Sequence, residues 1–262
     1  MKRKYITALL STLVLIVAPV TDPFVPVVAA AQENAETPND VLNLEESDWG
    51  TLSEQMNTRL YTGGSRNIDV ITGYAIEVPN SILKELAGKK TTLALHTGDG
   101  IAISLTGTDI RATDRTFRLV LSAEGVIPDS VKQQVLESAL AAREFSMPEK
   151  ERYPFCVNVH VSLGAEYSGK PAMLYCYDEA ANTLRLAGIY PITESGHAMF
   201  ALNRGDEYIA VVREGDAYVV KPGEHLDGIA RRNGLKLKSL LAANPHITNA
   251  NVIYPGQVII LP

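Results

Sequence analysis

Short β-branched and aromatic segments, separated by glycine, asparagine or aspartate, run from Ile68 to Val212 and constrain the fold more than any other feature. Residues of this kind favour strands, and the turn residues between them prevent long helices. Strands that follow one another so closely pair antiparallel. We therefore predict a β-rich, sandwich-like, mainly antiparallel body over residues 67–213. Its expected strands are Ile68–Thr72, Thr91–His96, Ile101–Leu105, Phe117–Ser122, Phe155–Ser162, Ala172–Tyr177, Leu184–Tyr190, Ala198–Leu202 and Tyr208–Val212.

Two helices are expected between these strands. An apolar residue and proline lead into Asn-Ser at 78–81 and into Asp-Ser at 127–130, and helical spacing of apolar residues follows each motif. The same spacing extends the second helix to about Phe145. Gly98-Asp99-Gly100 and Asp178–Asn182 have the composition of tight turns, so they predict two β-hairpins.

The first 31 residues have the pattern of an export signal. Basic residues 2–4 precede an uncharged apolar stretch, Ile6–Val20, and small residues Ala29 and Ala31 precede Gln32 at the expected cleavage site. An uncleaved membrane anchor is the alternative, but a spanning helix needs roughly 20 apolar residues. We expect a secreted, extracellular protein with no membrane contact after cleavage. No sorting motif follows Leu261, so we expect attachment to the cell surface to be non-covalent.

Residues 32–66 predict an acidic linker with a short helix. The stretch is rich in glutamate, aspartate and asparagine, a composition typical of solvated chain. Within it Trp49, Leu52, Met56 and Leu60 recur at helical spacing before Gly63-Gly64. We expect this helix to pack on the body.

The net charge of −6 is unevenly distributed. From Gln32 to Asp216 there are 16 Lys and Arg residues against 27 Asp and Glu, whereas Ala217 to Pro262 holds 5 against 2. An acidic body argues against nucleic acid as a partner. The mildly basic tail suits an anionic wall polymer, although such charges also occur on any solvated surface.

Cys156 and Cys176 are the two cysteines of the chain. Outside the cell, paired cysteines often form a disulfide. If the chain turns near Glu166, the two lie opposite each other on neighbouring strands. The alternative is a pair of small apolar residues on a packed face.

No catalytic residues, metal ligands or cofactor motif emerge from the chain. His96, His160 and His197 lack the spacing of metal ligands, and Cys156 and Cys176 lie in strands without a nucleophile motif. Glycoside hydrolysis needs two placed carboxylates. Glu144, Glu149 and Glu151 are candidates by abundance alone, and a charged loop explains them better. We expect a protein that is not an enzyme and takes no cofactor.

The last 46 residues, 217–262, predict a separate small domain. A strand at Tyr218–Val220 enters the turn Pro222-Gly223, and a helix from His225 to Asn233 ends at Gly234. Leucines at 237, 240 and 241 mark a second helix, and Pro255-Gly256 turns into a last strand. The order is strand, helix, helix, strand (βααβ), and the whole chain is multi-domain α+β.

This domain resembles the LysM family over its entire length. The positions that carry the resemblance are Tyr218, Val220, Gly223, Glu224, Leu226, Ile229, Ala230, Leu240, Asn244, Ile253, Pro255, Gly256, Gln257, Ile259, Leu261 and Pro262. The resemblance implies binding of N-acetylglucosamine-containing glycans, and the export signal favours peptidoglycan over chitin.

Two loops are the expected glycan-binding site. The predicted residues are Gly223, Glu224, His225, Leu226 and Asp227 in the first loop and Pro245, His246, Ile247 and Thr248 in the second. Gly223 lets a ligand approach the backbone, and the following helix start presents free N–H groups. Leu226, Ile229 and Ile253 also fit a simple core role, and Gly223 and Asn244 fit turn and cap roles. Asp227 stands where many relatives carry an aromatic residue, so a sugar platform is missing there.

The body resembles a β-rich module of secreted surface proteins of Gram-positive bacteria. The resemblance rests on Val78–Ile110 and on Val161–Val212, including Leu163–Glu166 and Tyr175–Asp178. It implies no activity. We therefore expect a non-catalytic, cell-wall-associated protein that binds peptidoglycan and displays its body. A wall-targeted hydrolase with an unfamiliar catalytic body, and a spore or envelope assembly protein that binds protein, are the alternatives.

Overall fold

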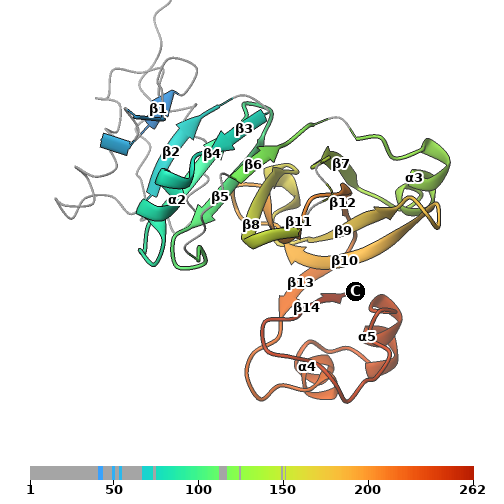
Figure 1. The fold of residues 1–262 in the computed structure, drawn as a ribbon. Helices are drawn as coiled ribbons and strands as arrows, with labels where there is room; N and C mark the ends of the chain where they lie inside the picture. The colour runs from blue at the N-terminus through green and yellow to red at the C-terminus, as the bar shows by residue number, and fades with distance from the viewer. Residues whose placement is uncertain are drawn as a thin grey trace, which may run out of the picture.

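The computed structural model describes residues 41–43, 49–50, 53–54, 67–72, 75–111, 117–123, 125–148, 150 and 152–262. The predicted export signal lies outside these residues, as does most of the predicted linker. A β-rich body is followed by a small C-terminal module (Figure 1). Among the described helices, none is both long and apolar enough to cross a membrane.

The larger sheet of the body has six strands. They are β1 (Val41–Asn43), β2 (Asn67–Ile71), β4 (Thr92–His96), β5 (Ile101–Thr106), β8 (Arg152–Ser162) and β11 (His197–Arg204), in the order β1-β2-β4-β5-β8-β11. β1, β2 and β4 run parallel, and the other pairs are antiparallel. The predicted turn at Gly98–Gly100 joins β4 to β5 as a hairpin. Residues 41–43 were predicted to be part of a linker, but as β1 they pair with β2 and belong to the sheet.

The smaller sheet has four strands. They are β7 (Ala141–Ser146), β9 (Pro171–Asp178), β10 (Thr183–Pro191) and β12 (Glu207–Val212), in the antiparallel order β10-β9-β12-β7. The predicted hairpin at 178–182 joins β9 to β10, with Asn182 at a φ of 49°. A two-stranded ribbon, β3 (Ala75–Val78) with β6 (Phe117–Val120), completes the body.

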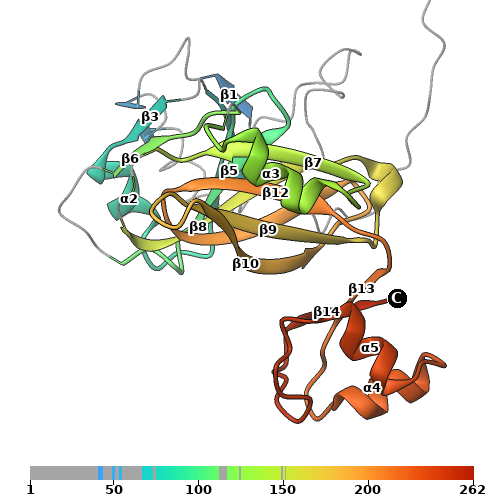
Figure 2. The same cartoon turned by 90° about the vertical axis from the view of Figure 1, so that its right-hand side faces the viewer.

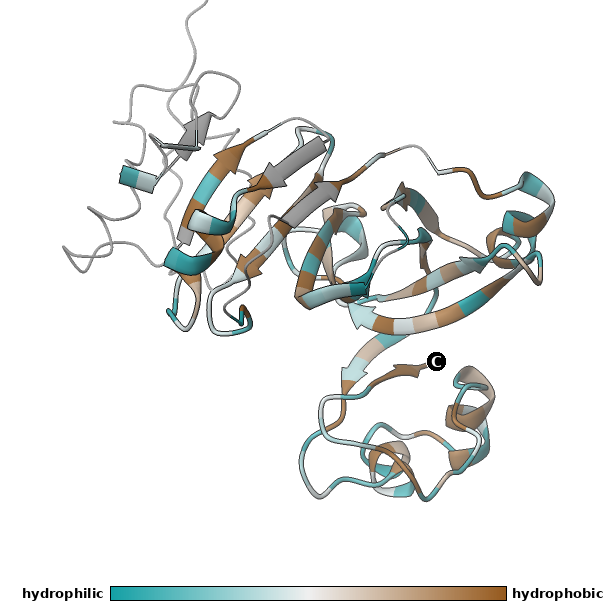
Figure 3. Cartoon of the chain, viewed as in Figure 1, coloured by the Kyte–Doolittle hydropathy of each residue, from teal (hydrophilic) through white to brown (hydrophobic). Residues whose placement is uncertain are grey.

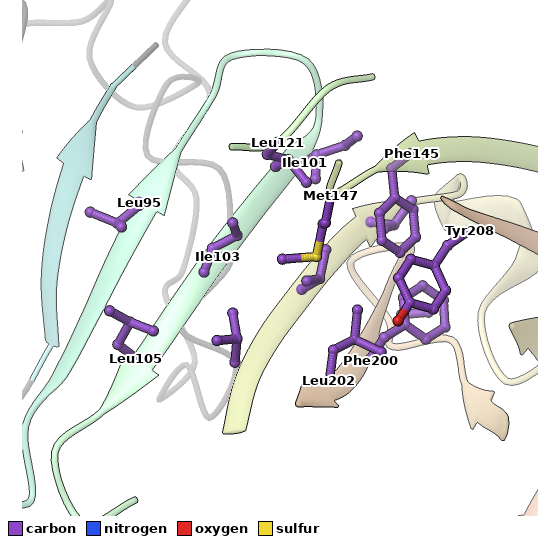
Figure 4. Packing of buried hydrophobic residues seen from close by; sticks show 14 of the residues in the cluster. Leu95, Ile101, Ile103, Leu105, Leu121, Phe145, Met147, Phe200, Leu202 and Tyr208 are labelled. Carbon is purple, nitrogen blue, oxygen red and sulfur yellow. The ribbon is translucent and has the colours of Figure 1, made fainter. Parts of the chain in front are cut away.

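One hydrophobic core extends through both sheets (Figure 4). Phe145 of β7 stacks on Tyr208 of β12, with ring centroids 5.2 Å apart, and lies 6.1 Å from Phe200 of β11. Tyr190 of β10 meets Phe200 edge-on at 5.0 Å. Apolar segments lie along the strands of both sheets (Figure 3). The sandwich-like, mainly antiparallel body expected from the sequence is confirmed.

The two helices of the body pack in different places. α2 (Asn80–Leu86) buries Ile82, Leu83 and Leu86 in the main core. α3 (Asp129–Leu136) lies over the smaller sheet (Figure 2), where Val131 and Val135 contact Ile209 and Val211 of β12. Both helices begin directly after a proline, which fixes the backbone dihedral φ at a value that suits a helix start.

The predicted extent of the second helix is wrong. The helix ends at Leu136, and residues 141–146 form β7, which pairs with β12 from Ala141 opposite Val212 to Ser146 opposite Glu207. The sequence Ala-Ala-Arg-Glu favours a helix locally. Burial of Phe145 between the sheets and the ladder to β12 outweigh that preference.

The cysteines are not bonded. The expected bridge required β8 and β9 to form a hairpin, but they belong to different sheets, and the 3₁₀ turn η2 (Ala165–Tyr167) carries the chain between them. Burial raises the pKa of the Cys176 thiol to about 11, because desolvation disfavours the thiolate, and the charge of Asp206 adds to the effect. Cys176 fits the alternative interpretation, a small apolar residue on a packed face, because its side chain belongs to the hydrophobic core that extends through both sheets.

Part of the predicted N-terminal helix is described. Residues 49–50 and 53–54 are helical, whereas Leu52, Met56 and Leu60 lie outside the described residues. Trp49 packs against the main core, and the Ser53 hydroxyl donates a hydrogen bond of 2.6 Å to Glu85 of α2. These contacts place this segment on the body, as expected.

The C-terminal module consists of β13 (Asp216–Val219), α4 (Leu226–Arg232), α5 (Leu237–Ala243) and β14 (Val258–Leu261). Its strands lie beside β10, and both helices are on the side away from the body (Figures 1 and 2). The Ala217 N–H donates to the Gly169 carbonyl at 2.8 Å, and Lys170 pairs with Glu214 at 3.1 Å. At Gly215 a Cβ atom would lie 2.5 Å from a β14 carbonyl oxygen, so glycine allows the close turn into the module.

Candidate functional site

The module has a core of its own beneath two short helices. The core contains Val220, Leu226, Ile229, Ala230, Leu240 and Ile259. α4 ends at Gly234, with a φ of 68°, and the Leu235 N–H donates to the Ala230 carbonyl at 2.8 Å. This arrangement is the C-terminal cap expected from the sequence. The predicted strand, helix, helix, strand order and the core role of Leu226 and Ile229 are confirmed.

The first predicted loop is organised by the carboxylate of Glu224. Tyr218 Oη donates to its two oxygens at 2.9 and 3.0 Å, and the Lys221 N–H donates to Oε2 at 2.8 Å. Arg232 also pairs with this carboxylate. Glu224 therefore holds the turn between β13 and α4 in place, and much of its hydrogen-bonding capacity is already used.

We predict that Glu224 makes the stability of the module depend on pH. The Lys221 N–H lowers the pKa of Glu224 below its ordinary value of 4.5, and the Tyr218 hydroxyl and Arg232 add to the effect. Because the folded-state pKa lies below the unfolded value, the stabilisation is complete above that value and is lost as the pH falls through the folded-state pKa. Calorimetry from about pH 7 to about pH 3 should show a falling melting temperature, which Glu224→Gln flattens. Equal acid sensitivity in both proteins would contradict this role.

The second predicted loop starts at a buried asparagine. Asn244 is fully buried, and its Nδ2 donates to the Leu240 carbonyl at 2.8 Å and to the Ile260 carbonyl at 2.7 Å. Its Oδ1 accepts the Ile260 N–H at 2.8 Å. Asn244 thus ties the end of α5 to β14 and has the cap role that the sequence left open.

The other predicted site residues differ in what they present to solvent. Gly223, His225, Asp227, Pro245 and Thr248 are exposed, His246 and Ile247 are partly buried, and Leu226 is buried. A ligand at the first loop would therefore meet the backbone of Leu226 and not its side chain. Burial lowers the pKa of His246, and its Nδ1 has no hydrogen-bond partner among the described residues. The Asp227 carboxylate pairs with Arg231.

The predicted Pro255-Gly256 turn lies next to the first loop, a position that the sequence pattern did not predict. The Val220 N–H donates to the Gln257 carbonyl at 2.9 Å, and the Gly256 N–H donates to the Val220 carbonyl at 2.8 Å. These bonds place Tyr254–Gln257 beside the start of the first loop. The Tyr254 side chain is 66% exposed. The aromatic surface that is absent at Asp227 is available at Tyr254, and an aromatic before a Pro-Gly turn is the signal that could have identified it.

The body has an open cavity beside α3. Its volume is about 650 Å³, and its lining includes Asp129, Lys132, Arg143 and Glu144. Lys132 Nζ pairs with Glu144 at 2.6 Å and with Asp129 at 2.9 Å, and these contacts raise the pKa of Lys132. Glu144 is the one carboxylate of the three considered for hydrolysis that lies within the described part of the chain. Among the described residues, no group of three or more His, Cys, Asp or Glu could hold a metal ion.

Comparison with known proteins identifies the class of the module. Residues 218–262 match the model of the LysM domain, so the C-terminal module is a LysM domain, and such domains bind N-acetylglucosamine-containing glycans such as peptidoglycan. An endolysin of Bacillus phage B103 is 30% identical over 123 residues, which are 47% of this chain and 44% of the endolysin. The match thus spans less than half of that relative. No solved structure matches the chain.

Proposed function

We propose that this protein is secreted, binds peptidoglycan through its LysM domain and displays the β-rich body at the cell wall without catalysing a reaction. The observation that carries the proposal is the LysM domain, which has its own core and an exposed aromatic side chain, Tyr254, in a turn beside its first predicted loop. Sugar rings pack on aromatic faces, and their acetamido groups hydrogen-bond to backbone donors and acceptors. The export pattern at the N-terminus supports a location outside the cell.

Tyr254 is the side chain that we expect to contribute most to glycan affinity. Tyr254→Ala removes an exposed aromatic platform and should weaken binding of N-acetylglucosamine oligomers about tenfold, or about 1.4 kcal/mol. Titration calorimetry measures the change, and Tyr254→Phe should retain most of the affinity. Val252→Ala removes another exposed apolar side chain near this turn and should have little effect. Unchanged affinity in Tyr254→Ala would exclude the turn from the site.

A wall hydrolase is the second candidate, and the similarity to an endolysin favours it. In that case the cavity beside α3 is the candidate active site, because the carboxylates of Glu144 and Asp129 line it. Both carboxylates already form ion pairs with Lys132, at 2.6 Å for Glu144 and 2.9 Å for Asp129.

The release of reducing sugars and of new amino groups from purified peptidoglycan distinguishes the two candidates. The proposed function predicts no release above that of a heat-denatured sample. Release that is abolished by Glu144→Gln would establish the hydrolase and overturn the non-catalytic proposal. The third alternative, an assembly protein, predicts that the LysM domain captures a protein partner and fails to bind glycan.

A further inference from the structure

Four cationic side chains lie around the turn between α4 and α5 of the LysM domain. Arg231 and Arg232 are in the last turn of α4, Lys236 is the N-cap of α5 and Lys238 is in its first turn. All four are exposed, the two arginine side chains to 76% and 56%. We call these four residues the cationic turn.

The two arginines have a structural explanation. Arg231 pairs with Asp227 and Arg232 pairs with Glu224. Cations also interact favourably with the partial negative charge at the C-terminal end of a helix, where both arginines lie. Their positions therefore follow from folding alone.

The two lysines have no such explanation. Lys236 and Lys238 lie at the N-terminal end of α5, where the partial positive charge of the helix disfavours cations. The first turn of α5 has no acidic residue, and the N-cap side chain makes no capping hydrogen bond. In the described part of the chain no carboxylate forms an ion pair with either lysine. Serine at the N-cap and glutamate in the first turn would stabilise the helix. The two lysines therefore act against local stability, and such departures from the local rules are expected at functional sites.

The uneven charge of the protein would confine the binding of an anionic partner to the C-terminal module. Residues 32–216 carry 11 more acidic than basic residues, whereas residues 217–262 carry three more basic than acidic ones. A flexible polyanion is repelled by the body and attracted to the cationic turn. Both helices lie on the side of the module away from the body (Figure 2), so the turn is open to such a partner.

We propose that the cationic turn binds an anionic cell-wall polymer with a phosphodiester backbone, as a second contact beside the glycan loops. This inference rests on the proposed function, because it takes the cell wall as the location of the protein. The ammonium groups of Lys236 and Lys238 contact phosphate oxygens as point charges, and no covalent step is involved. Two different polymers of the wall are then held by one small domain, which raises retention through effective concentration.

The test uses the chain from Gln32 to Pro262 and a glycerol phosphate oligomer as the probe. Lys236→Ser combined with Lys238→Glu should weaken probe binding about tenfold at about 50 mM NaCl. The same double variant should raise the melting temperature of the module by about 2–5 °C, because it places a capping residue and an acid at the helix start. The matched control is Lys89→Ser with Lys90→Glu in the body, which has the same charge change and should leave probe binding unaltered.

The opposite signs of these two effects make the test decisive. Probe affinity that the double variant leaves unchanged would overturn the inference, as would probe binding that is insensitive to salt up to about 300 mM NaCl. Loss of both stability and binding would assign the lysines a structural role and overturn it as well. Binding of N-acetylglucosamine oligomers, measured on the same samples, should be unaltered. If no sample binds these oligomers while the probe binds as expected, the proposed function fails and the cationic turn stands.

Discussion

Replacing Asn244 by alanine should unfold most of the LysM domain and abolish glycan binding. The variant loses three buried hydrogen bonds of 2.7–2.8 Å and leaves the Ile260 N–H and carbonyl without partners. Each unsatisfied buried group costs about 1–3 kcal/mol, so we expect a loss of about 3 kcal/mol. A hydrophobic core in a domain of this size supplies no more than about 3–5 kcal/mol. Little or no net stability is then left.

Hydrogen–deuterium exchange on the intact chain measures this effect locally. Peptides from residues 218–262 should lose protection in Asn244→Ala, while peptides from the body remain protected. Asn233→Ala is the matched control, because its side chain makes one hydrogen bond, at 2.8 Å to the Ile229 carbonyl, at an exposed helix end. Its cost should stay below about 1 kcal/mol. Protection in Asn244→Ala equal to that in Asn233→Ala would contradict the central role of Asn244.

Replacing Phe145 by alanine should destabilise the body by about 4 kcal/mol. The side chain is fully buried and contacts Tyr208 and Phe200, which come from the two different sheets. Its removal leaves a cavity at the place where the sheets pack, and Phe-to-Ala changes in cores cost about 3–5 kcal/mol. Urea unfolding followed by the fluorescence of Trp49, the single tryptophan, reports on this core because Trp49 packs against it.

The same variant also separates the stability of the body from glycan binding. Because the LysM domain has its own core, we expect it to stay folded at temperatures where the body of Phe145→Ala is already unfolded. At these temperatures the variant should bind N-acetylglucosamine oligomers with the affinity of the unmodified protein. Met199→Ala, at a side chain 49% exposed on β11, should change stability by less than about 0.5 kcal/mol. Loss of glycan binding in Phe145→Ala would mean that the module depends on the body.

Local patterns predicted most of the fold. Turn composition located the hairpins at 98–100 and 178–182, and strand composition located the long strands of both sheets. The errors occurred where tertiary contacts override local preference. Residues 141–146 have helical composition but complete a sheet, and Cys156 and Cys176 lie on consecutive strands that separate into different sheets. The residues of a short segment do not determine which distant strand that segment pairs with. The parallel pairing of β1 and the assignment of strands to the two sheets were therefore not predictable from local pattern.

The candidate site was predicted in part. The positions of Gly223, Glu224 and Pro245 in loops follow from the pattern of helix ends, which is a local property. The network that Glu224 forms with Tyr218, Lys221 and Arg232 depends on how the chain folds back, so it was not predictable from spacing. Tyr254 was missed for the same reason, because its turn reaches the first loop only through the pairing of Val220 with Gln257.

Co-sedimentation with purified peptidoglycan tests the central claim most directly. The chain from Gln32 to Pro262 is compared with the same chain ending at Gly215, which lacks β13 and the rest of the LysM domain. We predict that only the longer protein pellets with peptidoglycan and that N-acetylglucosamine oligomers release it. Equal pelleting of both proteins would place wall binding in the body, and pelleting of neither would contradict glycan binding by the LysM domain.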